Sequence, residues 1–209
     1  MTDHDTTSTN KRPLRPEDAM PGPERMPALG PDEMNDQQKA AAQALMDGPR
    51  GAVFGPFIPL MRSPDLMDRL QKVGEYLRYQ SAVETRINEF VMLVVSRHWS
   101  QQFEWCMHYP LALKAGVKQE VLDALAEGRR PAGMADDEEL AYDLCDELHR
   151  THGLSDATYR RAVERFGERG VIDMVALIGY FTTVSMVMNV AHTPPIANAT
   201  AQPLAAFPR

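Results

Sequence analysis

Residues 84–116 read ETRINEFVMLVVSRHWSQQFEWCMHYPLALKAG, and this stretch decides the fold. It predicts two consecutive helices, over 83–99 and 100–116, and the first is apolar throughout 90–95. A helix that is apolar on every side belongs in the centre of a fold. Ser100 is expected to open the second helix, Pro110 to bend it and Gly116 to end it. The pair therefore predicts the core of an all-α domain.

The same stretch holds a candidate proton-transfer site. Glu104 and His108 are four residues apart, so they share one face of a helix. A carboxylate beside an imidazole orients the ring and raises its pKa, which suits a general acid or base. Glu89 lies among apolar residues, where a carboxylate is costly unless it is paired or working. If the two helices pack as a hairpin, Glu89 can approach the Glu104/His108 face.

Spacing alone leaves two further roles open for Glu104 and His108. A glutamate and a histidine at this spacing are most often a solvated surface pair. They could also be two ligands of a metal ion, but a metal site needs further ligands that the sequence does not place. We therefore predict no metal site.

The rest of the chain also predicts helices, over 32–46, 63–79, 118–127, 136–150, 155–166 and 171–191. The loop 51–63 is rich in apolar residues and should be packed, so it is expected to line a pocket or an interface. Residues 1–31 form a proline-rich arm whose later half should lie against the protein. A single domain over 32–195 and a tail over 196–209 complete the predicted organisation.

Bulk composition excludes several classes of partner. The net charge of −7 argues against nucleic acid and against anionic membrane surfaces. The first ten residues are polar and do not form a signal peptide, which favours the cytoplasm. The apolar segment 171–190 contains polar residues and is expected to be a core helix and not a membrane span. Its apolar surface, with that of the 54–61 loop, predicts a homo-oligomer.

Several motifs resemble the carboxymuconolactone decarboxylase-like and alkylhydroperoxidase-like (AhpD-like) family. They are Arg86-x-x-Glu89 with the apolar run after it, Phe103-Glu104-Trp105-x-x-His108, and Ala112-x-x-Ala115-Gly116. The segments 55–57, 63–64 and 75–79 resemble longer members, and the resemblance covers about 26–192. It implies an AhpD-like helical bundle, homo-oligomers that are commonly trimers or hexamers, and catalytic proton transfer by Glu89, Glu104 and His108.

The resemblance extends to two branches with different chemistry. The peroxidase branch uses C-x-x-C-x-x-x-H, and its cysteine positions fall here on Gln101 and Glu104. Cys106 has no partner at that spacing, so Cys106 and Cys145 are expected to be core residues. The decarboxylase branch carries glutamate at the position of Glu104 and needs no cofactor. We therefore expect a lyase acting on a small carboxylated lactone or related acid, with a peroxidase-type oxidoreductase or a non-catalytic oligomeric binding protein as alternatives.

Candidate substrate-binding residues come from three parts of the chain. Arg86 or His98 (or Arg97, next to it) could stabilise negative charge that develops on a lactone oxygen. His192 follows the last helix and is a weaker candidate. Phe57, in the apolar loop, indicates a partly hydrophobic pocket, which favours an aromatic-derived or alicyclic acid as the small-molecule substrate.

Overall fold

The computed structural model describes residues 22–197, 199–201 and 203–204. All regular structure in these ranges is helical, which confirms the predicted all-α class. The helices are α1 (Asp36–Asp47), α2 (Phe57–Leu60), α3 (Pro64–Tyr79), α4 (Thr85–His98), α5 (Gln102–Ala115), α6 (Gln119–Ala126), α7 (Asp136–Thr151) and α8 (Asp156–Ala191).

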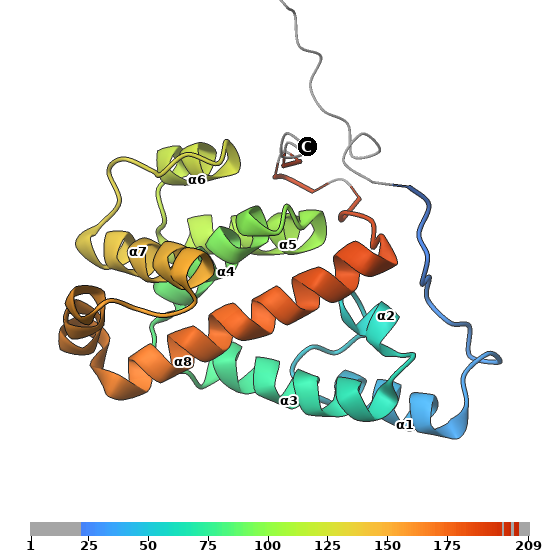
Figure 1. The fold of residues 1–209 in the computed structure, drawn as a ribbon. Helices are drawn as coiled ribbons and strands as arrows, with labels where there is room; N and C mark the ends of the chain where they lie inside the picture. Colours follow the sequence, from blue (N-terminus) through green and yellow to red (C-terminus); the bar gives the residue numbers. More distant parts are fainter. Residues whose placement is uncertain (1–21, 198, 202, 205–209) are drawn as a thin grey trace, which may run out of the picture.

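Helix α4 forms the centre of the larger hydrophobic core. It is buried continuously over 87–97 and packs against α5, α7 and α8. A smaller apolar cluster joins α1, α2 and α3. Figure 1 shows α8 running between these two groups of helices, with α4 to α7 on one side and α1 to α3 on the other. The helix predicted from the apolar run is therefore central, as its composition requires.

Helix α2 lies in the segment 51–63, which was predicted as a loop, and the other helix boundaries agree with the predicted ones to within a few residues. Helix α5 is capped by Gln101, whose side chain accepts a hydrogen bond from the Glu104 backbone N–H. The predicted cap, Ser100, instead adopts a left-handed conformation with φ of 49° in the turn. Gly116 ends α5 in the left-handed conformation that favours glycine at this position.

The apolar spacing of α3 predicts a buried stripe of Leu66, Leu70, Val73 and Leu77, and the structure buries only part of it. Leu66 and Val73 are both 47% exposed, whereas Met67, Gly74 and Leu77 are buried. Gly74 lies inward because the Tyr180 ring of α8 packs directly against it: a Cβ atom on Gly74 would lie 2.3 Å from the Tyr180 hydroxyl. A glycine carries no hydropathy signal, so the sequence pattern missed the contact that orients this helix.

Two of the expected helices, 155–166 and 171–191, form one element with a break. Gly167 has φ 70° and ψ 165° inside α8 and separates the two parts. By length and composition α8 could cross a membrane, but 56% of its most apolar window is buried within this fold. Its buried Asp173 accepts a hydrogen bond of 2.8 Å from the Ala82 backbone N–H. Helix α8 therefore serves as a core helix here.

The described part of the N-terminal arm lies against the helices, as predicted for its later half. The Arg25 backbone N–H donates to the Ala191 carbonyl at 2.8 Å, and Arg62 donates to the Pro27 carbonyl at 2.6 Å. In the tail, the backbone of Leu204 makes two hydrogen bonds with the Gln102 side chain, at 2.8 and 2.9 Å. The earlier half of the arm (1–21), with residues 198, 202 and 205–209, lies outside the described residues.

The Gly74–Tyr180 contact makes a test of this packing possible. We predict that Gly74→Ala lowers the free energy of unfolding by about 1–3 kcal/mol, because the new methyl group overpacks the contact. The matched control is Gly153→Ala in the exposed turn after α7, where an added Cβ meets nothing within 4 Å. Alanine should stabilise that position by up to about 1 kcal/mol, because it restricts the unfolded chain. Urea unfolding measures both, and a stabilised Gly74→Ala variant would contradict the packing.

Candidate functional site

The three residues singled out in the α4–α5 hairpin meet in the interior. His108 Nδ1 lies 2.6 Å from Glu89 Oε2, and His108 Nε2 lies 3.2 Å from Glu104 Oε2. His108 is 2% exposed, Glu89 6% and Glu104 4%, so Glu104 and His108 are not a solvated surface pair. The imidazole ring thus has one carboxylate on each nitrogen.

The turn between α4 and α5 places these side chains, and α8 holds that turn. Asn189 of α8 donates its amide N–H to the Trp99 carbonyl at 2.9 Å. The Trp99 indole N–H donates to Thr182 Oγ1, also on α8, at 3.2 Å. The Phe181 ring packs edge-on against the His108 ring, with centroids 5.2 Å apart. Helix α8 therefore fixes both the hairpin and the orientation of the imidazole.

Opposing effects act on the charge of His108. Burial lowers the pKa of His108, but hydrogen bonds to Glu104 and Glu89, and the charges of both carboxylates, outweigh it and raise the pKa. The protonated ring donates an N–H to each carboxylate, which is the arrangement that an imidazolium needs in a buried place. The site therefore favours the protonated form of His108 more than water does.

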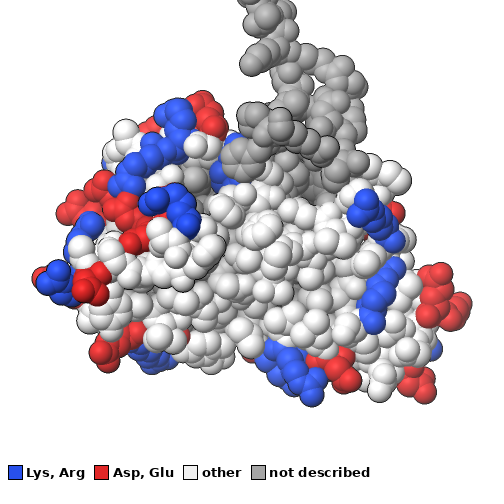
Figure 2. Space-filling view, in the orientation of Figure 1, with Lys and Arg blue, Asp and Glu red and all other residues white. Residues whose placement is uncertain are grey.

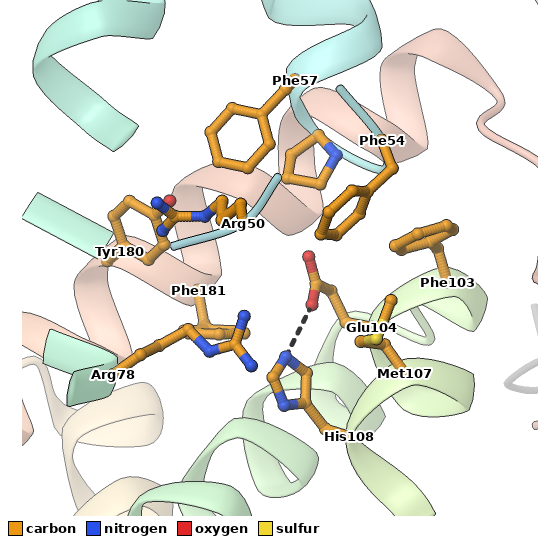
Figure 3. A pocket seen from close by; sticks show the side chains of 11 residues that line it. Arg50, Phe54, Phe57, Arg78, Phe103, Glu104, Met107, His108, Tyr180 and Phe181 are labelled. Atoms are coloured by element: carbon orange, nitrogen blue, oxygen red, sulfur yellow. Dashed lines mark ion pairs between the residues drawn. The ribbon is translucent and has the colours of Figure 1, made fainter. Parts of the chain in front are cut away.

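A pocket opens onto the Glu104/His108 side of the hairpin (Figure 3). Its cavity volume is only about 20 Å³, enough for one water molecule, although its mouth is open to solvent. The lining comes from the 50–57 loop and from α2, α3, α5 and α8. It comprises Arg50, Phe54, Pro56, Phe57, Arg78, Phe103, Glu104, Met107, His108, Tyr180 and Phe181.

Several of these lining residues, chiefly Arg50, Arg78 and Tyr180, were not predicted from the sequence. Arg50 follows the end of α1 and Arg78 lies in the last turn of α3, and neither has a spacing relation to the hairpin. Burial raises the pKa of Tyr180 to about 12, so its hydroxyl stays protonated. Phe57, by contrast, was predicted and does line the pocket.

Three predicted substrate-binding residues do not line this pocket. Arg86 bridges α4 to α7, with ion pairs of 2.7 Å to Asp137 and 2.6 Å to Glu138. The His192 ring makes a 3.1 Å hydrogen-bond contact with the Pro23 carbonyl and so contributes to docking the arm. Both side chains thus have structural partners away from the hairpin acids.

His98, the third, lies on the other side of α4, facing a separate cavity of about 130 Å³ that Arg97 also lines. It follows Glu89 by nine residues, about two and a half helical turns, which puts it on the opposite face. There its ring stacks on the His149 ring of α7 with centroids 4.0 Å apart. Helical geometry, which joined Glu104 to His108, thus separates His98 from them.

Both cysteines lie in the core. Cys106 and Cys145 are buried free thiols, and burial raises the pKa of each. A thiol reacts as its thiolate, so burial of this kind suppresses redox chemistry. Within the part of the chain that the structure describes, no group of three or more histidine, cysteine, aspartate or glutamate residues is arranged to hold a metal ion.

Two solved structures are similar to this chain over most of its length. The chain superposes on a peroxidase-related protein of Ralstonia eutropha JMP134, described as an alkylhydroperoxidase AhpD core, with a TM-score of 0.70 and 16% identity over 88% of this chain and 98% of that one. An uncharacterized peroxidase-related protein of Silicibacter sp. TM1040 gives a TM-score of 0.67 and 15% identity over 86% and 95%. No family model matches the chain, and no curated protein is detectably similar to it. The chain therefore has the AhpD-like helical fold.

The raised pKa of His108 predicts a pH-dependent stability. A group whose pKa is raised by folding stabilises the protein fully below its unfolded pKa of about 6.5, and that contribution is lost as pH rises through the folded pKa. We expect His108→Gln to cost about 3–5 kcal/mol near pH 6.5, since it leaves two buried carboxylates without their cation. The cost should shrink at pH values above the folded pKa.

Urea unfolding of wild type and His108→Gln across this pH range measures the difference. His152→Asn, at an exposed histidine after α7, serves as the control and should show no such trend. A cost for His108→Gln that stays constant or grows with rising pH would contradict an imidazolium at this position.

Proposed function

We propose that this protein is a lyase that decarboxylates a small carboxylated lactone or related acid by proton transfer, without a cofactor. The observation that carries the proposal is the buried His108 ring, which has a carboxylate on each nitrogen and lines a pocket. Such a ring can store a proton and deliver it to a carbon atom. The resemblance of the 84–116 stretch to the decarboxylase branch supports the same chemistry.

The proposed reaction has two steps. The bond between the substrate carbon and its carboxylate breaks, carbon dioxide leaves, and the electron pair spreads into the conjugated carbonyl as an enolate. The protonated His108 then gives its proton to the carbanionic carbon, which forms the new C–H bond. Solvent returns the proton to the imidazole after product leaves.

The two carboxylates have different tasks in this scheme. Glu89 makes the shorter contact, 2.6 Å to Nδ1, and does not itself line the pocket, so it holds the ring and stabilises its charge. Glu104 makes the longer contact, 3.2 Å to Nε2, and does line the pocket. The Nε2 proton is thus the one that can reach substrate, either directly or through Glu104.

A peroxidase-type oxidoreductase is the second candidate, because both structural neighbours are described as peroxidase-related. Thiol chemistry would have to use Cys106, which is buried and lacks a cysteine at the C-x-x-C spacing. Gln101 and Glu104 stand at the positions of the cysteine pair. Gln101 caps α5, and Glu104 contacts His108. The lyase proposal gives Glu104 a role in proton transfer, whereas the peroxidase proposal needs a cysteine at each of these two positions.

We also propose a homo-oligomer, a trimer or hexamer. Helix α8 exposes apolar side chains at Ile172 (67%), Met186 (41%) and Val190 (58%). Figure 2 shows a broad uncharged face over α8, with charged side chains gathered toward the edges of the molecule. A second copy of this chain is the proposed cover for that face.

Replacement of His108 tests the proposed chemistry. We predict that His108→Gln lowers the rate of carbon dioxide release from a carboxylated lactone by about a hundredfold or more, the usual scale for a lost general acid. Glu89→Gln should lower this rate strongly, with a smaller effect on the free energy of unfolding. His152→Asn is the control and should keep the wild-type rate. Circular dichroism confirms that each variant is folded, and a folded His108→Gln variant with the wild-type rate would refute the mechanism.

Replacement of both cysteines distinguishes the lyase from the peroxidase-type oxidoreductase. We predict that Cys106→Ala combined with Cys145→Ala leaves carbon dioxide release within about twofold of wild type, since neither thiol has a part in proton transfer. Neither native thiol should react rapidly with a disulfide reagent while the protein is folded. Peroxide reduction that requires Cys106 would favour the oxidoreductase instead.

A further inference from the structure

Two arginine side chains reach the pocket from outside the α4–α5 hairpin. Both Arg50 and Arg78 line the pocket, and Figure 3 shows the Arg78 guanidinium beside His108 and the Arg50 guanidinium beside the Tyr180 ring. Both are partly buried, and neither forms an ion pair with an acidic side chain among the described residues. Buried or half-buried guanidinium groups usually have a carboxylate partner. These two therefore have unused capacity to bind an anion.

Arg50 is held in place by neutral groups. Its Nη1 donates to the Gln71 carbonyl at 3.1 Å, and its guanidinium lies over the Phe57 ring, 5.0 Å from the centroid. Its Nη2 and the Tyr180 hydroxyl both lie within 3 Å of the point where Gly74 would carry a Cβ atom. The missing side chain of Gly74 thus makes room for Arg50 beside Tyr180. These contacts fix the guanidinium without neutralising it.

The guanidinium of Arg78 has fewer partners than that of Arg50. Its guanidinium lies over the Tyr79 ring, 5.3 Å from the centroid. Its Nε is buried and has no hydrogen-bond partner among the residues that the structure describes. A buried donor without a partner is costly, and ligand binding is a common way to satisfy it.

A charge count over the pocket gives the sign of a complementary ligand. With both carboxylates ionised and the His108 ring protonated, Glu89, Glu104 and His108 together carry a net charge of −1. One arginine would balance the remaining negative charge, so the second leaves an excess of one positive charge. A ligand with a single negative charge makes the site neutral.

The remaining walls of the pocket are aromatic. Phe54 and Phe103 stack with centroids 6.4 Å apart and an interplanar angle of 29°, and Phe57 meets Phe54 edge-on at 6.4 Å. Gly55 allows this packing, since a Cβ atom there would lie 2.5 Å from the Phe103 ring. Flat apolar walls favour an unsaturated or cyclic ligand body.

We propose that Arg50 and Arg78 form a carboxylate-binding subsite for an acid with a small planar ring, and that the carboxylate held there is one that the product keeps, so that the product is a monoanion. The carboxylate lies between the two guanidinium groups, and the ring lies against Phe54 and Phe103. The free space is small, so the flexible side chain of Met107, which is partly exposed at the pocket, moves aside when ligand enters. This subsite rests on the proposed function for its identity as a substrate site, but its affinity for anions can be measured separately.

Different elements of the fold supply the proton-transfer groups and the proposed carboxylate-binding groups. Residues of α4 and α5 supply the proton-transfer groups, whereas the cationic groups come from the 50–57 loop and α3, and Phe103 of α5 completes the apolar wall. Changes at Arg50 and Arg78 should therefore alter which acids bind while the contacts of His108 with Glu89 and Glu104 remain.

Calorimetric titration with simple acids tests the proposal. The probes are acetate, 2-furoate and benzoate, each compared with its neutral amide. We expect saturable binding of at least one ring carboxylate, tighter than acetate, and at least tenfold weaker binding of the matching amide. Arg50→Gln and Arg78→Gln should each weaken carboxylate binding by about tenfold or more. Arg69→Gln is the matched control, because Arg69 is an exposed arginine of α3 whose hydrogen bond goes to the Asp65 carbonyl, away from the pocket lining.

The possible results separate the subsite from the lyase. Absence of saturable carboxylate binding, equal binding of the amide, or unchanged affinity in both arginine variants overturns the subsite. Carboxylate binding that is lost in both variants, in a protein that releases no carbon dioxide from any carboxylated lactone, keeps the subsite and removes the lyase. Turnover whose KM is unchanged in both arginine variants keeps the lyase and removes the subsite.

Discussion

The ion pair network of Glu89, His108 and Glu104 is the constraint on which the rest of this structure depends. Burying a charged side chain in a protein interior costs several kcal/mol in lost hydration unless a partner of opposite charge is correctly placed. Here the ring nitrogens lie 2.6 and 3.2 Å from two carboxylate oxygens on different helices. Any change in the register of α4 against α5 would break one of these contacts and leave a buried charge.

Other parts of the fold maintain that register. Helix α8 fixes the hairpin turn through Asn189 and Trp99, and it places Phe181 against the imidazole. The same helix carries Tyr180, which packs on Gly74 of α3. The pocket thus lies where the α4–α5 hairpin meets the α1–α3 group, with α8 contacting both (Figure 1). Proton-transfer groups and cationic groups come together because one helix positions both halves.

Sequence analysis could predict the hairpin and its acids because the relevant signals are local. The run 90–95 is apolar on all sides, Glu104 and His108 share a helical face, and Glu89 is costly where it stands. Arg50 and Arg78 left no comparable signal, because their approach to His108 depends on how α3 packs. That packing is set by Gly74, a residue without a side chain. Arg86 and His98 looked equally suitable as anion donors, but the first reaches α7 and the second lies on the far face of α4.

Two carboxylates hold His108 as an imidazolium in this account of the site. Nuclear magnetic resonance of the histidine ring nitrogens as a function of pH tests it most directly, in the wild type and in Glu89→Gln and Glu104→Gln. We predict a wild-type midpoint above the ordinary value of 6.5, and a lower midpoint in each variant. His98 and His149, whose pKa values are lowered chiefly by burial, should titrate below 6.5 in the same spectra. A wild-type His108 midpoint at or below 6.5, or one that neither substitution moves, would contradict the claim.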